Sequence, residues 1–134
     1  MELNLELGQI FWLNIPLFSE KNWKYERPFL VYGVDDENYI LLKISSSLKD
    51  YLDQFDFSLT SKPSSLYKKN NFVEPNILIY IEHNLFLYIL NKTTLPVEQG
   101  QSILPKDFNE ITKMVKGCFN NKKYQGNRYE VRIK

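Results

Sequence analysis

The stretch "YERPFLVYGVDDENYILLKISSS", residues 25–47, contains two apolar runs on either side of an acidic turn. The residues at 35–38, "DDEN", are typical of turns. The runs at 29–34 and 39–44 are rich in aliphatic and aromatic residues that favour strands. The stretch therefore predicts a β-hairpin. An Arg-Pro pair opens its first strand, and three serines follow its second strand.

This hairpin predicts that a cation and a hydroxyl lie at the same end of the sheet. In an antiparallel pair, the residue that opens the first strand faces the residue that closes the second, so Arg27 and Ser45 are expected roughly 5 Å apart. An arginine donates two hydrogen bonds to phosphate oxygens, and hydroxyls can donate to the same oxyanion. RNA carries its own nucleophile, the 2′-hydroxyl. The pair is compatible with RNA cleavage by internal attack, although such an arginine is more often a solvated cap and such serines a loop or helix cap.

Outward from the hairpin, the apolar pattern predicts a mainly β chain. Strands are expected at 8–15, 29–34, 39–44, 76–82 and 85–90, with a two-residue turn at His83-Asn84. A helix is expected at 106–119 after Pro105, and a shorter helix at 47–55. The tail at 120–134 is expected either to add a last strand or to remain a flexible arm. Because the strands follow one another as hairpins, the fold class is α+β, mainly β, with an antiparallel, partly closed barrel.

A length of 134 residues fits a single domain over 1–134. We expect a barrel core at about 8–104, a C-terminal helix at about 105–119 and a polar tail at 120–134.

Composition excludes several kinds of site. One histidine and one cysteine cannot supply a Cys/His zinc site, and the five glycines are too scattered to form a phosphate-binding loop. His83 is predicted to be a turn residue rather than the base of a catalytic triad, and the acidic run at 35–37 a solvated hairpin tip. We therefore predict no metal and no cofactor. The net charge of +1 lacks the excess expected of a broad nucleic-acid-binding face.

The remaining sequence signals favour a cytoplasmic protein. Cys118 is the single cysteine, so it has no internal disulfide partner. No signal peptide is recognisable at the N-terminus, and no apolar run approaches the ~18 residues that span a bilayer.

The order of these segments resembles the MazF/PemK/Kid toxins. The segments that carry the likeness are "GQIFWLNI", a polar loop, "ERPFLVYGV", "YILLKISSS", "NILIYIEHNLFLYILN" and "LPKDFNEITKMVKGCF". The resemblance covers residues 8–119. It implies an SH3-like barrel of the PemK/MazF/CcdB type, often a homodimer. It also implies a metal-independent endoribonuclease that cuts single-stranded RNA, usually mRNA, to a cyclic phosphate and is inhibited by a cognate antitoxin.

The resemblance also assigns site residues. The family arginine falls on Arg27, and its strand-end hydroxyl on Ser45, with Ser46 as the alternative register. Glu26 is a candidate proton acceptor. Predicted RNA contacts come from the first loop and from nearby lysines: Trp23, Lys24, Tyr25, Lys43 and Lys49.

Departures from the family pattern keep other interpretations open. The hairpin turn is shorter than usual, and Leu85 and Phe86 occupy the region where a basic residue often follows. "YILLKISSSLK" is also similar to the ToxN branch, whose antitoxin is RNA, although the Arg-Pro pair favours the MazF/PemK branch and a protein antitoxin. One alternative is a non-catalytic RNA- or protein-binding module on the same barrel, including a protein that poisons gyrase. Another is an unrelated small α+β protein. Surplus aromatic residues at Phe55, Phe57, Phe72 and residues 80–88 suggest a homodimer.

Overall fold

The computed structural model describes residues 5–15, 26–46, 56–93, 97–124 and 126–133. Along the chain, the elements are β1 (Gln9–Leu13), β2 (Arg27–Val34), β3 (Asn38–Ser45), β4 (Phe57–Ser58), β5 (Phe72–Val73), β6 (Ile77–Glu82), α1 (His83–Lys92), β7 (Gln101–Ser102), α2 (Pro105–Asn120) and β8 (Tyr129–Ile133). The predicted class, a mainly β partly closed barrel with a C-terminal helix, is confirmed.

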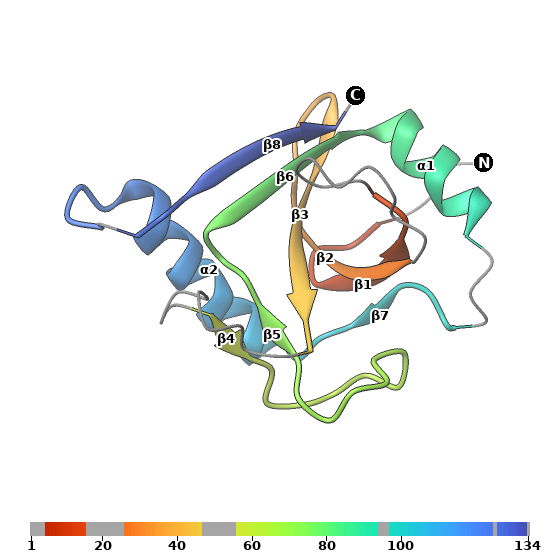
Figure 1. Ribbon diagram of the computed structural model, residues 1–134, viewed down its shortest axis with the longest axis horizontal. Coiled ribbons are helices and arrows are strands. Elements are labelled where there is room, and N and C mark those ends of the chain that lie inside the picture. The colour runs from red at the N-terminus through yellow and green to blue at the C-terminus, as the bar shows by residue number, and fades with distance from the viewer. Residues whose placement is uncertain (1–4, 16–25, 47–55, 94–96, 125, 134) are drawn as a thin grey trace.

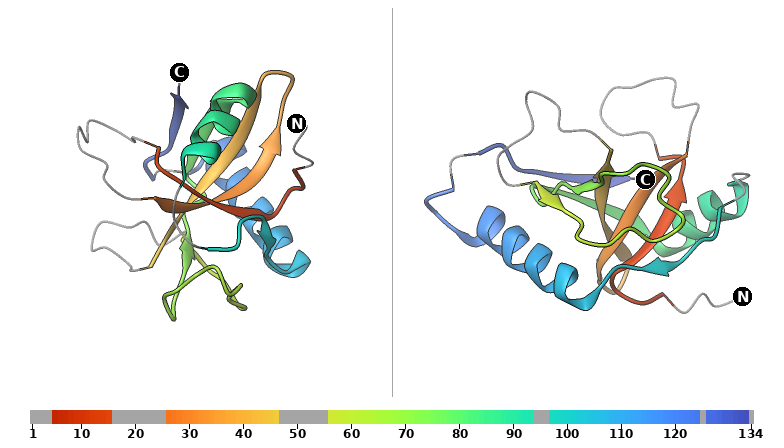
Figure 2. Two further views of the ribbon diagram at one scale, coloured as in Figure 1. Left: turned by 90° about the vertical axis from the view of Figure 1, so that its right-hand side faces the viewer. Right: turned by 90° about the horizontal axis from the view of Figure 1, so that it is seen from below.

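One continuous sheet runs in the order β4-β5-β3-β2-β1-β7, and β6 branches from β3 and pairs with β8 on its other side. The first half of β3 pairs with β6, whereas Ile44 and Ser45 at its end pair with β5. Sharing one long strand between two partners curves the sheet into a partial barrel. Figure 1 shows α1 and α2 on opposite sides of the strands, and Figure 2 shows β7 beside β1.

The strands have apolar residues on both faces, as the sequence of 8–15 predicted. Alternate side chains point to opposite faces of a strand. One set forms a core cluster with α1: Phe11, Leu13, Ile15, Phe29, Val31, Leu41, Ile77, Ile79, Ile81 and Phe86. The other set forms a second cluster with α2: Ile10, Leu30, Leu42, Ile44, Leu66, Val73, Leu78, Ile103, Ile111 and Val115. The central strands are therefore covered by a separate apolar core on each face.

Gly8 fixes the start of β1. Its φ of +94° lies in the left-handed region that favours glycine. Its N–H donates to the carbonyl of Val31 at 2.8 Å, and its own carbonyl accepts from the N–H of Ile103 at 3.0 Å. One residue thus ties β1 to strand β2 and to the segment that follows β7.

The predicted turn at 35–38 is confirmed as the tip of the β2–β3 hairpin. The N–H of Asp35 donates to the carbonyl of Asn38 at 2.8 Å. The Asp35 carboxylate accepts from the N–H groups of Glu37 and Asn38 at 2.9 and 2.6 Å. These bonds, that from Glu37 first, hold the pKa of Asp35 below its usual value. The carboxylate therefore stabilises the turn in its ionised form.

The predicted strand at 85–90 and the predicted turn at His83-Asn84 are wrong, because both belong to helix α1. Apolar residues at nearly every position satisfy a helical and a strand period alike, so a short run does not decide between them. Packing decides here: Phe86 is fully buried in the first cluster, and Leu85, Leu87, Ile89 and Leu90 pack partly against it. The N–H of His83 donates to the carbonyl of Glu37 at 3.1 Å, which joins the helix start to the hairpin tip.

The C-terminal part of the chain forms a helix and a strand. The helix predicted at 106–119 is confirmed as α2. Of the two alternatives for the tail, the structure has the strand: β8 runs parallel to β6, with Ile79 opposite Val131 (Figure 1). The barrel is thus antiparallel except at this pair. The helix predicted at 47–55 lies outside the described residues.

Asp107 anchors the segment that follows β4. It lies in the first turn of α2 and is 1% exposed. Its Oδ1 accepts from the Thr60 hydroxyl at 2.7 Å and its Oδ2 from the Thr60 N–H at 3.1 Å. The carboxylate therefore holds residue 60 against the helix by two hydrogen bonds.

We expect Asp107→Ala to lower the free energy of unfolding by about 1–3 kcal/mol, because it removes two hydrogen bonds to a charged, buried carboxylate. Urea unfolding measures this change. Glu110→Ala is the matched control, because Glu110 forms an ion pair at 3.1 Å with Lys113 and both side chains are exposed. Such pairs on a helix surface contribute about 0.2–0.5 kcal/mol. Equal effects of the two substitutions would contradict the anchoring role.

Candidate functional site

The ends of three strands meet where β2 begins. Leu13 of β1 pairs with Arg27, and Phe29 of β2 pairs with Lys43 of β3. Extending this antiparallel register by two residues places Arg27 opposite Ser45, as the sequence predicted. The arginine therefore lies between the last residue of β1 and the last residue of β3.

A pocket of about 360 Å³ opens at this end of the hairpin. All four residues predicted to be catalytic, Glu26, Arg27, Ser45 and Ser46, line it. The other lining residues are Trp12, Pro28, Ile44, Tyr67, Lys68 and Asn71. Residues that carry a guanidinium, a carboxylate and two hydroxyl groups, from the start of β2 and the end of β3, thus line one cavity, which we call the hairpin-end pocket.

Of the five predicted RNA contacts, only Lys43 lies within the described residues. Lys43 has its Nζ 3.9 Å from Oε2 of Glu74, and the two side chains are only 12% and 7% exposed. It is not among the described residues that line the hairpin-end pocket. Its ammonium group instead balances a buried carboxylate within the fold. Trp23, Lys24, Tyr25 and Lys49 lie outside the described residues.

Two aromatic residues of the pocket were missed by the sequence analysis. The rings of Trp12 and Tyr67 are 5.3 Å apart, measured between their centroids, and tilted by 48°. Trp12 lies between two buried residues of β1, so its sequence looks like core. Tyr67 comes from the segment between β4 and β5, far away in sequence. The neighbouring aromatic and basic residues "YKK" at 67–69 were the only local signal of a binding role.

The backbone of Trp12 is clamped by the amide of Gln99. The Trp12 N–H donates to Oε1 of Gln99 at 2.8 Å, and Nε2 of Gln99 donates to the Trp12 carbonyl at 2.9 Å. This side chain thereby replaces a neighbouring strand at the edge of β1. The indole Nε1–H of Trp12 is buried and meets no hydrogen-bond acceptor among the described residues. The backbone of Trp12 is therefore held in place by Gln99, whereas its indole N–H has no acceptor among the described residues.

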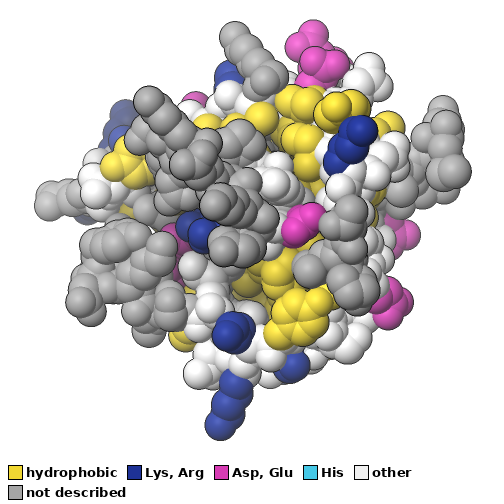
Figure 3. Space-filling model, turned by 45° about the vertical axis from the view of Figure 1, so that its right-hand side comes forward, with side chains coloured by type: hydrophobic (Ala, Val, Ile, Leu, Met, Phe, Trp, Pro, Cys, Tyr) yellow, Lys and Arg dark blue, Asp and Glu magenta, His cyan; other side chains and the backbone are white. Residues whose placement is uncertain are grey.

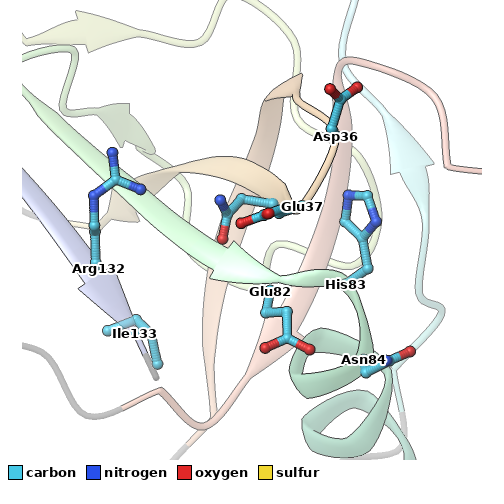
Figure 4. Close-up of a pocket in the computed structure, with 8 residues that line it drawn as sticks. Asp36, Glu37, Glu82, His83, Asn84, Arg132 and Ile133 are labelled. Carbon is cyan, nitrogen blue, oxygen red and sulfur yellow. The ribbon is translucent and has the colours of Figure 1, made fainter.

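A second pocket, of about 680 Å³, lies at the opposite end of the hairpin. Figure 4 shows Glu82, His83 and Asn84 where β6 meets α1, with Asp36 and Glu37 from the hairpin tip and Arg132 from β8. The His83 ring lies 4.3 Å from that of Tyr39, measured between centroids. The histidine thus joins the helix start to β3 and has no role in the hairpin-end pocket.

Charge separates the two pockets. Among the described residues, three carboxylates and one arginine line the second pocket, whereas Arg27 and Lys68 outnumber Glu26 in the hairpin-end pocket. On the face shown in Figure 3, Lys and Arg side chains are scattered among acidic and hydrophobic ones and do not form one basic patch. The charges of these residues repel an anionic ligand from the second pocket and attract it to the hairpin-end pocket. The hairpin-end pocket is therefore the candidate site.

In the part of the chain that the structure describes, no group of three His, Cys, Asp or Glu side chains is arranged to hold a metal ion. No helix among these residues is long and apolar enough to cross a bilayer.

Comparison with solved structures finds a mycobacterial endoribonuclease in complex with its cognate antitoxin. The TM-score is 0.54, the identity is 9%, and the match covers 89% of this chain and 97% of the other. No protein-family model and no curated protein sequence matches. At this identity the likeness concerns the fold alone. The chain therefore shares its fold, a partly closed β barrel carrying helices, with an endoribonuclease that binds an antitoxin.

Proposed function

We propose that this protein is an endoribonuclease that cleaves single-stranded RNA in the hairpin-end pocket without a metal ion. The observation that carries the proposal is the meeting of Arg27, Glu26, Ser45 and Ser46 in one cavity. The fold shared with an endoribonuclease supports it. The product is a 2′,3′-cyclic phosphate, because the nucleophile is the 2′-hydroxyl of the RNA itself.

The reaction assigns one role to each group. The Glu26 carboxylate accepts the proton of the 2′-hydroxyl, and the 2′-oxygen forms a new bond to phosphorus. The bond from phosphorus to the 5′-oxygen breaks, and this oxygen takes a proton from water. Arg27 donates two hydrogen bonds to the non-bridging oxygens as their charge grows. The hydroxyl of Ser45, or of Ser46 in the alternative register, donates to the same oxygens.

The partners follow from the same proposal. The neighbouring structure holds an endoribonuclease with its cognate antitoxin, so we propose an antitoxin for this chain too, a protein rather than an RNA, with mRNA as the substrate. We also propose a homodimer. Sedimentation as a monomer at tens of micromolar would contradict the dimer, and failure to bind or be inhibited by the product of an adjacent gene would contradict the antitoxin.

The direct test incubates purified protein with a long single-stranded RNA in EDTA. We expect discrete fragments that end in cyclic phosphate by mass spectrometry, and no cleavage of the same RNA carrying 2′-O-methyl groups. Ser45→Ala and Ser46→Ala form a matched pair in this assay. The serine that donates to the phosphate should lose about 10²- to 10³-fold in cleavage rate, and the other should lose far less.

Two results would contradict this assignment. Equal, full activity of both serine variants would exclude a hydroxyl donor. If the RNA stays intact but binds saturably, the protein is a binding module on the same barrel and not an enzyme.

A further inference from the structure

We propose that Tyr67 and Trp12 form a stacking wall in the hairpin-end pocket, on which an unpaired nucleobase lies beside the phosphate held at Arg27. This inference rests on RNA being the ligand of the pocket, as proposed above. It adds a residue outside the hairpin, Tyr67, that determines how tightly the RNA is held.

The first argument is the position of the two rings. Trp12 comes from β1 and Tyr67 from the segment between β4 and β5, and both line the cavity that contains Arg27. Trp12 contacts the Tyr67 ring at a centroid distance of 5.3 Å, yet Tyr67 remains 57% exposed. Ring surface is therefore left for a third planar group next to the phosphate-binding side chain.

The second argument is the rigidity of the segment that presents Tyr67. The preceding Leu66 is 1% exposed in the core that packs against α2. The N–H of Ser65 donates to Oε1 of Gln101 at 2.7 Å, and Lys62 Nζ donates to the carbonyl of Leu66 at 2.8 Å. Asp107 holds Thr60 further upstream. An aromatic ring held in place before binding loses little freedom when a ligand arrives.

The third argument is chemical. Unstacked bases of single-stranded RNA bind to aromatic side chains through their faces, whatever the base. Lys68 follows Tyr67 in the same wall and supplies a cation for the backbone. A chain with a net charge of +1 has little general attraction for RNA, so stacking must supply much of its affinity.

The test measures binding of a short single-stranded RNA whose 2′-hydroxyls are all methylated, so that it cannot be cleaved by internal attack. Fluorescence anisotropy reports the dissociation constant. Tyr67→Ala should weaken binding about 10- to 100-fold, which is the effect of losing one stacked base. Tyr67→Phe keeps the ring and should bind as the wild type does. Tyr88→Ala is the control, because Tyr88 is 60% exposed on α1, away from the pocket.

A second set of probes replaces each nucleotide in turn by an abasic one. At the position that stacks on Tyr67, the abasic replacement should weaken binding to the wild type by the same 10- to 100-fold. The affinity of Tyr67→Ala should not change with that replacement. Three results would contradict the stacking role of Tyr67. These are unchanged RNA binding by Tyr67→Ala, an equal loss of binding in Tyr88→Ala, and no binding of the methylated RNA by the wild type.

Cleavage distinguishes this inference from the proposed function. If RNA binding depends on Tyr67 but no cleavage occurs, the nuclease proposal is wrong and the stacking role stands. If the RNA is cleaved but its binding does not depend on Tyr67, the stacking role is wrong and the nuclease proposal stands. If Tyr67→Ala no longer binds a protein partner but binds RNA as the wild type does, the exposed ring recognises protein and the stacking role is wrong.

Discussion

Arg27→Ala is expected to lower the rate of RNA cleavage by about 10²- to 10³-fold, because in the proposed reaction this side chain supplies the donors for the growing negative charge of the phosphate. The loss should appear in single-turnover rates at saturating protein, so that weaker binding is not mistaken for slower chemistry. Arg27→Lys keeps the charge but not the planar pair of donors, and it should give an intermediate rate.

The control for this prediction is Arg132→Ala. Arg132 lines the acidic pocket at the far end of the hairpin, and its guanidinium lies 4.4 Å from the centre of the Tyr80 ring. Its removal changes the net charge equally but leaves the hairpin-end pocket intact, so the cleavage rate should stay near that of the wild type. Similar losses in both variants would mean that overall charge, rather than the pocket, controls activity. Melting curves of both variants serve to check that the fold is retained.

Phe86→Ala is expected to lower the free energy of unfolding by about 3–5 kcal/mol. Phe86 is fully buried, and its ring lies 5.4 Å from that of Phe11 and 4.9 Å from that of Tyr39, measured between centroids. The substitution opens a cavity between α1 and the sheet. Because small domains are stable by only about 5–15 kcal/mol, the loss is a large part of the total.

Urea unfolding followed by circular dichroism measures the effect. Tyr88→Ala, on the same helix but 60% exposed, should cost less than about 1 kcal/mol. If Phe86→Ala leaves too little folded protein to measure, Phe86→Leu should give a smaller loss of the same sign. Equal sensitivity at positions 86 and 88 would contradict the helical placement of this segment.

The hairpin was predictable because its signals are local. Two apolar runs, turn residues at 35–38 and the antiparallel geometry together predict Arg27 and Ser45 at one end of the hairpin, and both line one pocket there. The helix α2 was predictable because its apolar stripe is long enough to repeat.

The remaining features depend on contacts far apart in the sequence. Helix α1 was mistaken for a strand because its six-residue apolar run fits both periods, and only packing of Phe86 on the first core decides. The parallel pairing of β8 with β6 needs α2 between the two strands to bring them together. Tyr67 reaches Trp12 only because Leu66 and Ser65 are fixed against the second core and β7.

The two cores described above have a consequence for how the strands find their alignment. A slip of one residue between paired strands normally moves apolar side chains into water, and this penalty fixes the alignment. In this barrel such a slip would move them from one core to the other, so the penalty is reduced. Alignment must then depend on features at the strand ends: the left-handed Gly8, the Asp35 turn and the Gln99 clamp on Trp12. The same end features therefore keep Arg27 opposite Ser45, and errors there would separate these two residues, which are proposed to act together, while leaving a compact apolar interior.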